Sequence, residues 1–115
     1  MFHVVKRDGE IADFQIGKIT EALRKAFEAT GFQYSQDMLD MMGLRVTADF
    51  QGKIAEEKIS VEDIQDSVET VLSQCGYAEV AKAYILYRRQ REKIRNMKST
   101  ILDYKEIVNS YVKVE

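Results

Sequence analysis

The sequence contains no proline, and this absence is the strongest constraint on its fold. Proline most often ends helices and fixes turns, so a chain without it forms long, uninterrupted helices easily. Its 6 glycines must then end the helices, and Gly31 and Gly76 each follow an apolar helical pattern. A chain of 115 residues is long enough to fold as one domain around a single modest core.

The first residues predict two short strands, at about 2–6 and 10–14, joined by a tight turn. Apolar side chains lie on both sides of Asp8-Gly9. Asp-Gly between apolar-rich flanks is a strong hairpin signal, because glycine accepts a positive φ without a steric clash. A further short extended piece is expected at Lys58-Ile59. The predicted sheet therefore has two strands, with room for a third.

Apolar residues at helical spacing predict four helices after the hairpin. Ser35 and Ser60 precede two of them and are good N-caps. The predicted fold class is α+β, mostly α, with a small N-terminal hairpin packed on a four-helix bundle. The four helices are expected at about 16–30, 36–50, 60–75 and 78–97, followed by a last helical segment at 101–112.

Three methionines, Met38, Met41 and Met42, cluster in the second predicted helix. Methionine fills irregular gaps in cores, and it also lines promiscuous binding surfaces. We interpret the cluster as core and keep a partner-binding groove as the alternative.

The inventory of reactive residues disfavours a stand-alone enzyme. The chain has 1 cysteine, Cys75, and 1 histidine, His3. These exclude an intramolecular disulfide and a four-ligand Cys/His zinc site, and no metal site is predicted. Catalytic triads and thiol dyads are poorly supported, and no pair of carboxylates stands out as an acid/base couple.

The charge balance argues against direct binding to nucleic acid. Lys and Arg total 17 and Asp and Glu total 19, which gives a net charge of -2. No apolar run is long enough to span a membrane, and no secretory signal is visible at the N-terminus. A reduced, cytoplasmic protein is the default expectation.

The positive features of the sequence are cationic. Lys6 and Arg7 precede the predicted turn, and Lys18 lies in the first turn of the first helix. Phosphates are bound by arginine forks, lysine charges and helix N-termini. The residues alone leave a solvated surface and a phosphate site open, and no glycine-rich phosphate loop is present. The fourth predicted helix adds three arginines: Arg88, Arg89 and Arg91.

Four ordered blocks of sequence stand out. They are Val5-Lys6-Arg7-Asp8-Gly9, Phe14-Gln15 with Lys18-Ile19, Ile59 with Val61-Glu62-Asp63-Ile64-Gln65-Asp66, Val68 and Glu69, and Ala81-Lys82-Ala83-Tyr84-Ile85-Leu86-Tyr87-Arg88. Together they resemble the ATP-cone domain, over about residues 2–95. The resemblance implies a domain at 1–96 that binds ATP and dATP, with a hairpin lid on a four-helix bundle. It also implies a helical linker at 97–115 towards a catalytic domain.

Domains of this kind usually lie at the N-terminus of ribonucleotide reductases, where ATP permits activity and dATP stops it, often by changing the quaternary assembly. The segment from Ser99 to Glu115 looks like the one that leads into an anaerobic ribonucleoside-triphosphate reductase. The resemblance therefore implies an N-terminal piece of such an enzyme, with the catalytic domain of the same chain as partner and nucleotide-dependent homo-oligomers.

The alternatives are an oligomerisation module, or a transcriptional regulator, with a degenerate nucleotide site. A related repressor carries the domain behind a zinc ribbon with several cysteines, and the single Cys75 disfavours it.

Carried over by position, the resemblance implies that Lys6, Arg7 and Lys18 bind the phosphates of ATP or dATP, accompanied by Mg²⁺. The three arginines lie where such domains place basic residues near the phosphates. Gly17 departs from the pattern, which has a larger and often charged residue there. The predicted nucleotide-binding set is Val5, Lys6, Arg7, Asp8, Gly9, Gln15, Lys18, Ile19, Val61, Arg88, Arg89 and Arg91.

Overall fold

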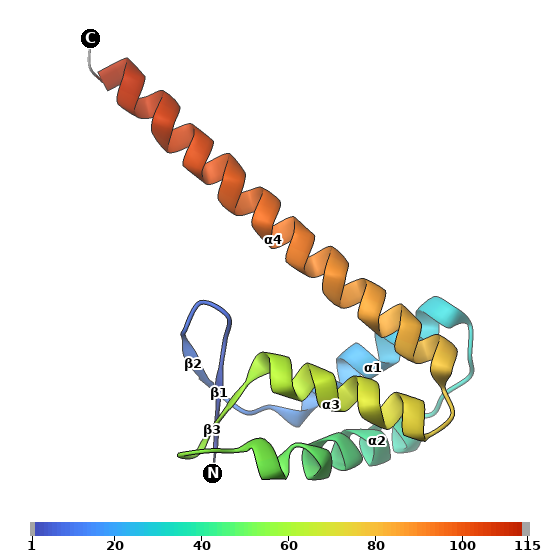
Figure 1. Ribbon diagram of the computed structural model, residues 1–115. Helices are drawn as coiled ribbons and strands as arrows, with labels where there is room; N and C mark the ends of the chain where they lie inside the picture. Colours follow the sequence, from blue (N-terminus) through green and yellow to red (C-terminus); the bar gives the residue numbers. More distant parts are fainter. Residues whose placement is uncertain (1, 114–115) are drawn as a thin grey trace. The chain divides into compact units, whose positions relative to one another are not determined.

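The computed structural model of the protein describes the backbone of residues 2–113 and the side chains of residues 2–98. The predicted α+β, mostly helical architecture is confirmed (Figure 1). Two compact units are distinguished, Met1–Ile85 and Leu86–Glu115. The elements are β1 (His3–Val5), β2 (Ile11–Asp13), α1 (Ile16–Thr30), α2 (Gln36–Asp49), the 3-10 helix η1 (Gln51–Lys53), β3 (Lys58–Ser60), α3 (Val61–Gln74) and α4 (Ala78–Lys113).

The three strands form one sheet in the order β2-β1-β3. β1 and β2 are the antiparallel arms of the hairpin, with Val4 opposite Ala12. β3 runs parallel to β1 along its other edge, with Val4 opposite Ile59 and Val5 opposite Ser60. Both the hairpin and the third strand agree with the sequence expectation, although each hairpin strand is one residue shorter at each end than predicted.

The hairpin turn has the chemistry that the Asp-Gly signal predicts. Gly9 adopts a φ of 88°, and its N–H donates to the Lys6 carbonyl at 3.0 Å. The Asp8 carboxylate accepts the Glu10 N–H at 3.0 Å. A side chain at Gly9 would strain the left-handed backbone that this turn requires.

The predicted serines cap the starts of α2 and α3, and the predicted glycine ends α1. The Ser35 hydroxyl accepts the Met38 N–H at 3.2 Å, and the Ser60 hydroxyl accepts the Asp63 N–H at 3.1 Å. Each bond satisfies one of the amides that a helix start leaves unpaired. α1 ends at Gly31, whose φ is 74°.

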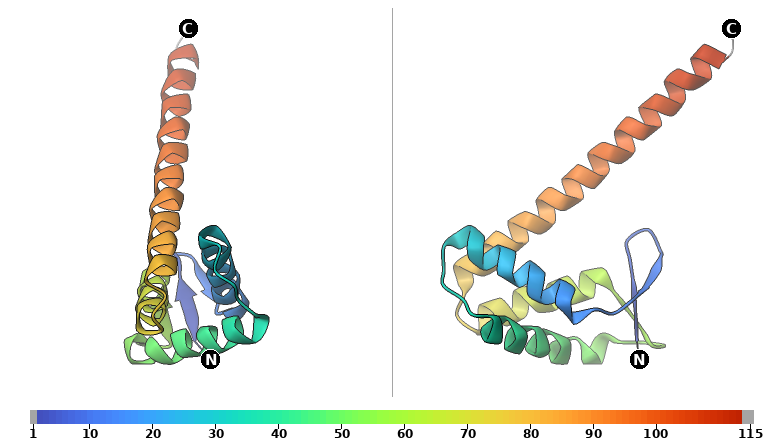
Figure 2. Two further views of the ribbon diagram at one scale, coloured as in Figure 1. Left: turned by 90° about the vertical axis from the view of Figure 1, so that its right-hand side faces the viewer. Right: turned by 180° about the vertical axis from the view of Figure 1, so that it is seen from behind.

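The core of the first unit lies between the helices. α2 packs against both α1 and α3 (Figure 2), and the beginning of α4 contributes Val80, Ala81 and Tyr84 to the same core. Phe2 and Phe14 of the hairpin region meet Phe50, each with ring centroids 5.7 Å from it, so this aromatic trio fastens the sheet to the end of α2. The largest fully buried side chains are Phe27, Phe50, Leu23, Leu39, Leu72, Val46, Val68, Val71 and Val80.

The expected break between the fourth helix and a last helical segment is wrong. α4 is a single helix, Ala78–Lys113. The sequence at the expected break, Lys98-Ser99-Thr100, contains neither glycine nor proline, and modest helix formers alone do not end a helix. The boundary between the predicted domain at 1–96 and linker at 97–115 falls inside α4 and stays a prediction, and residues 114–115 lie outside the described part.

The methionine cluster divides in two. Met42 is buried and Met38 is half-buried against the core, as expected. Met41 is 64% exposed, so its interpretation as core is wrong. The two inward methionines stand four residues apart and share one helix face, whereas Met41 lies about a quarter-turn away from Met42.

α4 is long, but residues 88–98 within it are strongly charged. Across the part of the chain that the structure describes, no helix combines the length and apolar character needed to cross a bilayer.

The exposed side of α1 carries an ion-pair network. The Arg24 guanidinium donates to both Glu21 and Glu28, and the Tyr34 hydroxyl donates to Glu28. The hydrogen bonds from Tyr34 and Arg24 hold the pKa of the Glu28 carboxyl below its usual value.

The core predicts a large difference between two phenylalanine truncations. Phe50 is fully buried in the aromatic trio, whereas Phe32 is 46% exposed. Phe50→Ala should lower the free energy of unfolding by about 3–5 kcal/mol, because it leaves a cavity. The control Phe32→Ala should lower it by less than about 1 kcal/mol. Urea unfolding followed by circular dichroism measures both, and equal losses would contradict this account of the core.

The Glu28 network predicts a change in acid stability. A carboxyl with a lowered folded pKa contributes stability that is present above its unfolded pKa and is lost as the pH falls through the folded pKa. Glu28→Gln should therefore flatten the decline in the free energy of unfolding from neutral pH to about pH 3. Glu56→Gln, outside the network, serves as the control. An unchanged acid profile in Glu28→Gln would show that the network contributes nothing to stability.

Candidate functional site

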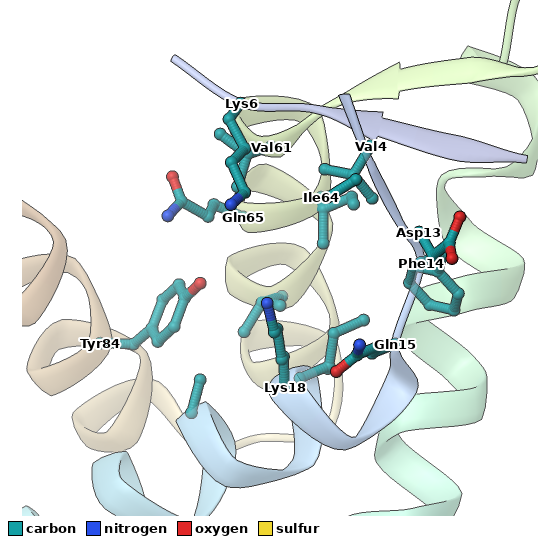
Figure 3. Close-up of a pocket in the computed structure, with 14 residues that line it drawn as sticks. Val4, Lys6, Asp13, Phe14, Gln15, Lys18, Val61, Ile64, Gln65 and Tyr84 are labelled. Atoms are coloured by element: carbon teal, nitrogen blue, oxygen red, sulfur yellow. The ribbon is translucent and has the colours of Figure 1, made fainter. Parts of the chain in front are cut away.

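A cavity of about 230 Å³ opens inside the first unit, between the sheet, α1, α3 and the beginning of α4 (Figure 3). Most of its wall is apolar, with a few polar side chains among them, which is the usual make-up of a small-molecule site. It is lined by Val4, Lys6, Ala12, Asp13, Phe14, Gln15, Lys18, Ile19, Ala22, Val61, Ile64, Gln65, Val68 and Tyr84.

The lining follows from the periods of strand and helix. Val4 and Lys6 stand two residues apart at β1, so they lie on the same side of the sheet. Lys18 and Ala22 stand four apart on α1 and share a face. α3 contributes a full stripe at intervals of three, four and seven residues, made of Val61, Ile64, Gln65 and Val68.

Two lysines from different elements serve the same cavity. Figure 3 shows Lys6 reaching from the sheet and Lys18 from α1 towards a common space, with Gln65 and Tyr84 beside it. Within residues 2–98, neither ammonium group has an ion-pair partner, and the Asp13 carboxylate of the wall pairs with His3 at 3.3 Å. Two neighbouring positive charges without counter-charge favour an anionic ligand.

Gln65 adds a polar group that the protein leaves unsatisfied. Its amide oxygen Oε1 is buried and accepts no hydrogen bond from the described residues. A buried acceptor without a donor costs about 1–3 kcal/mol. Gln65 is also one of the residues that line the cavity. Ser67 Oγ is also buried and unpaired, but it does not line the cavity.

A smaller cavity of about 200 Å³ lies where the hairpin meets the start of α3. It shares Lys6 and Val61 with the larger cavity. The Arg7 guanidinium stands beside it, with Nε 3.7 Å from Glu62 Oε1. Its lining is completed by Val5, Arg7, Ser60 and Glu62.

The structure brings together most of the residues predicted from the hairpin and the first helix. Lys6, Gln15, Lys18, Ile19 and Val61 line the larger cavity, and Val5 and Arg7 line the smaller one. Asp8 and Gly9 line neither, because they build the turn that precedes β2.

The predicted arginines of α4 belong to the second unit, where Arg91 lies over the Tyr87 ring at 5.9 Å from its centroid. A role for Arg88, Arg89 and Arg91 in nucleotide binding stays a prediction. Gly17 stands in the first turn of α1, and a Cβ built there meets no atom within 4 Å. The departure from the family pattern at Gly17 therefore leaves open space.

Sequence reasoning missed several residues of the wall, among them Val4, Phe14, Ile64, Gln65 and Tyr84. One signal was available, since Gln65 follows the predicted Val61 by one helical turn and so shares its face. The contribution of Tyr84 depends on how α4 begins against α3, which no local pattern specifies.

The unpaired Gln65 oxygen predicts that the ligand-free chain becomes more stable when this oxygen is removed. Gln65→Met keeps the shape of the side chain and removes the unsatisfied acceptor. We expect the free energy of unfolding of the ligand-free chain to rise by up to about 1–2 kcal/mol, because the desolvation cost disappears. Urea unfolding measures it, with Gln36→Met on the exposed start of α2 as control. A loss of stability above about 1 kcal/mol in Gln65→Met would contradict the prediction.

Comparison with known proteins identifies the family of the chain. The family model described as the ATP cone domain matches residues 2–93. The chain is 41% identical over 98 residues to ribonucleoside-diphosphate reductase subunit alpha of Chlamydia pneumoniae, which covers 80% of this chain and 9% of that protein. It is 35% identical over 103 residues to the anaerobic ribonucleoside-triphosphate reductase of Haemophilus influenzae, covering 87% and 14%.

A third relative is the vitamin B12-dependent ribonucleoside-diphosphate reductase of Thermoplasma acidophilum, at 40% identity over 100 residues, covering 83% of this chain and 12% of that protein. The chain thus spans about a tenth of the length of the curated relatives that it matches. The resemblance inferred from the four sequence blocks is confirmed. The chain belongs to the ATP cone domain family.

Proposed function

We propose that the chain is the regulatory domain of a ribonucleotide reductase and that its larger cavity binds the effectors ATP and dATP. The observation that carries the proposal is an apolar cavity bordered by Lys6 and Lys18, which have no ion-pair partners within residues 2–98. The family and the reductase relatives support a regulatory role.

The size and chemistry of the cavity suit the base and sugar of a nucleotide, whereas its triphosphate would lie outside the apolar part. About 230 Å³ is below the usual range of about 300–1,000 Å³ for small-molecule pockets. It accommodates a base and sugar against apolar side chains such as Val4 and Ile64, and the triphosphate then lies at the lysines. Gln65 lines the cavity and carries the amide that we propose contacts the nucleoside.

The phosphates would be held by Lys6 and Lys18, with Arg7 close by at the smaller cavity. Residues 2–98 contain no cluster of three carboxylate, histidine or cysteine side chains that could hold an ion by themselves. Mg²⁺ would therefore enter bound to the phosphate oxygens, as it commonly does with nucleotides.

ATP and dATP differ by one hydroxyl, so a regulatory site needs a group that senses it. An unmet buried acceptor is worth about 1–3 kcal/mol, enough for a preference of tenfold or more. We propose that the Gln65 amide, whose oxygen has no partner among the described residues, senses this hydroxyl, since Gln65 lines the cavity.

Regulation further requires that the nucleotide bind two states of the protein with different affinities. We propose that these states differ in assembly and that the catalytic domain of the same parent chain receives the signal. The relatives belong to different reductase classes, and we propose the anaerobic triphosphate reductase, one of these classes, as the parent.

Titration calorimetry with ATP, dATP and GTP in the presence of Mg²⁺ tests the proposal. We expect binding of both adenine nucleotides and weaker binding of GTP. Lys6→Ala with Lys18→Ala should weaken adenine-nucleotide binding about 100-fold or more, because each charged hydrogen bond contributes about 1.5–3 kcal/mol.

The matched control is Lys25→Ala with Lys53→Ala, which removes the same charge from residues that line neither cavity. Its affinity should stay within about threefold of that of the parent chain, which separates a local contact from a loss of net charge. Absence of heat with both adenine nucleotides at millimolar concentration would refute the proposal.

A further inference from the structure

The second unit presents an apolar stripe that its own described residues leave uncovered. Every described residue of this unit belongs to α4. Leu86 is 57% exposed, Ile94 is 49% exposed and Met97 is 56% exposed. Helices of globular proteins owe most of their stability to the packing of an apolar face. This part of α4 is therefore suited to a packing partner that the described residues of its unit do not supply.

The stripe has the spacing of a coiled-coil seam. Its positions follow one another at intervals of three, four and three residues, as a and d do in a heptad, and they are Tyr87, Gln90, Ile94 and Met97. The sequence of α4 continues with apolar residues at the same spacing, namely Ile101, Tyr104, Val108 and Tyr111. A repeat sustained over three to four heptads is typical of a coiled coil.

The described charges beside this seam are all positive. On this register, Arg91 and Lys98 stand at e and Lys93 stands at g. The acidic residue of the same stretch, Glu92, stands at f, on the side of the helix farthest from the seam. The Arg91 guanidinium lies over the Tyr87 ring at 5.9 Å from its centroid, which keeps the charge at the edge of the seam. A partner therefore meets a positive border on both sides of the apolar stripe.

This border argues against a second copy of the chain on the same face. In a parallel pair of helices, g faces the e position five residues further on, so Lys93 would face the Lys98 of the other copy on both sides. In an antiparallel pair, e faces e and g faces g, so cations would again oppose one another. Opposed like charges are costly at an interface. A different helix with glutamate or aspartate at its e and g positions would give attractive pairs along the whole border.

Gln90 favours a protein partner over a lipid surface. Basic amphipathic helices also bind anionic membranes. Gln90 stands at d, in the middle of the stripe, where hydrocarbon would leave its amide without hydrogen-bond partners. A facing helix can supply such a partner, and a single polar residue in a seam fixes the register of a helix pair.

We propose that residues 86–98 of α4 dock an acidic amphipathic helix of the parent chain's catalytic domain. The apolar side chains of that helix pack on Ile94 and Met97, and its carboxylates pair with Lys93 and Lys98. That the catalytic domain supplies the helix rests on the function proposed above. It is supported by the length of the curated relatives, of which the chain spans about a tenth.

Fluorescence anisotropy with a labelled synthetic peptide tests the chemistry of the face. The peptide repeats a heptad with isoleucine at a, leucine at d and glutamate at e and g. We expect it to bind the whole chain at least about tenfold more tightly than a matched peptide with lysine at e and g. Ile94→Gln with Met97→Gln should weaken binding at least about tenfold, because two apolar contacts are lost. Lys93→Glu with Lys98→Glu should reverse the preference between the two peptides.

The control is Lys25→Glu with Lys53→Glu, which makes the same change in net charge outside α4. Its affinity for the acidic peptide should stay within about threefold of that of the parent chain, and circular dichroism checks that each variant is folded. An acidic peptide that binds no more tightly than the basic one overturns the proposal. So does tighter binding of phosphatidylserine vesicles than of the acidic peptide, which would identify a lipid surface as the partner.

Hydrogen exchange in the intact parent reductase tests where the helix comes from. The amides of residues 89–98 should exchange at least about tenfold more slowly there than in the 115-residue chain, because a docked helix suppresses local opening. Ile94→Gln with Met97→Gln in the parent should remove this protection. Equal exchange in the parent and in the 115-residue chain would overturn the assignment to the catalytic domain. None of these measurements uses a nucleotide, so their failure is distinguishable from a failure of the proposed effector site.

Discussion

The parallel pairing of β1 with β3 is the interaction on which the site depends. β3 leads directly into α3, whose start is capped by Ser60. The register that sets Val5 opposite Ser60 brings the residues just after β1 to the beginning of α3. Lys6 and Arg7 then stand beside the first turn of a helix, where the unpaired amides and the dipole favour negative charge. Without this pairing, the hairpin would be a two-stranded ribbon that meets the helices through the aromatic trio but is not aligned with the start of α3.

The parts of the fold that could be predicted from the sequence are those set by local chemistry. The Asp8-Gly9 turn, the serine caps and the glycine stop after α1 each involve residues within four positions of one another. The parallel register of β3 could not be derived in this way, because a three-residue strand pairs with a partner more than fifty residues away. The continuity of α4 was not predicted, although the sequence at 98–100 contains neither glycine nor proline.

The residues of the candidate site differ in the same way: some could be predicted from local sequence and others could not. Lys6 and Lys18 stand out in the sequence because cations near a turn and a helix start have a recognisable chemistry. Gln65 and Tyr84 do not, since a glutamine or tyrosine on a helix gains its meaning only from the elements packed around it. Met41 shows the converse error, in which composition suggested burial and the helix phase placed the side chain in water.

Lys6 lines both cavities, and this sharing has a consequence for any charged molecule that enters either one. A single ammonium group cannot be fully committed to two anions at once, so filling one compartment leaves less attraction in the other. Thermodynamic reciprocity makes this antagonism equal in both directions. The hairpin strand thus couples two compartments through one flexible side chain, and no movement of the backbone is required.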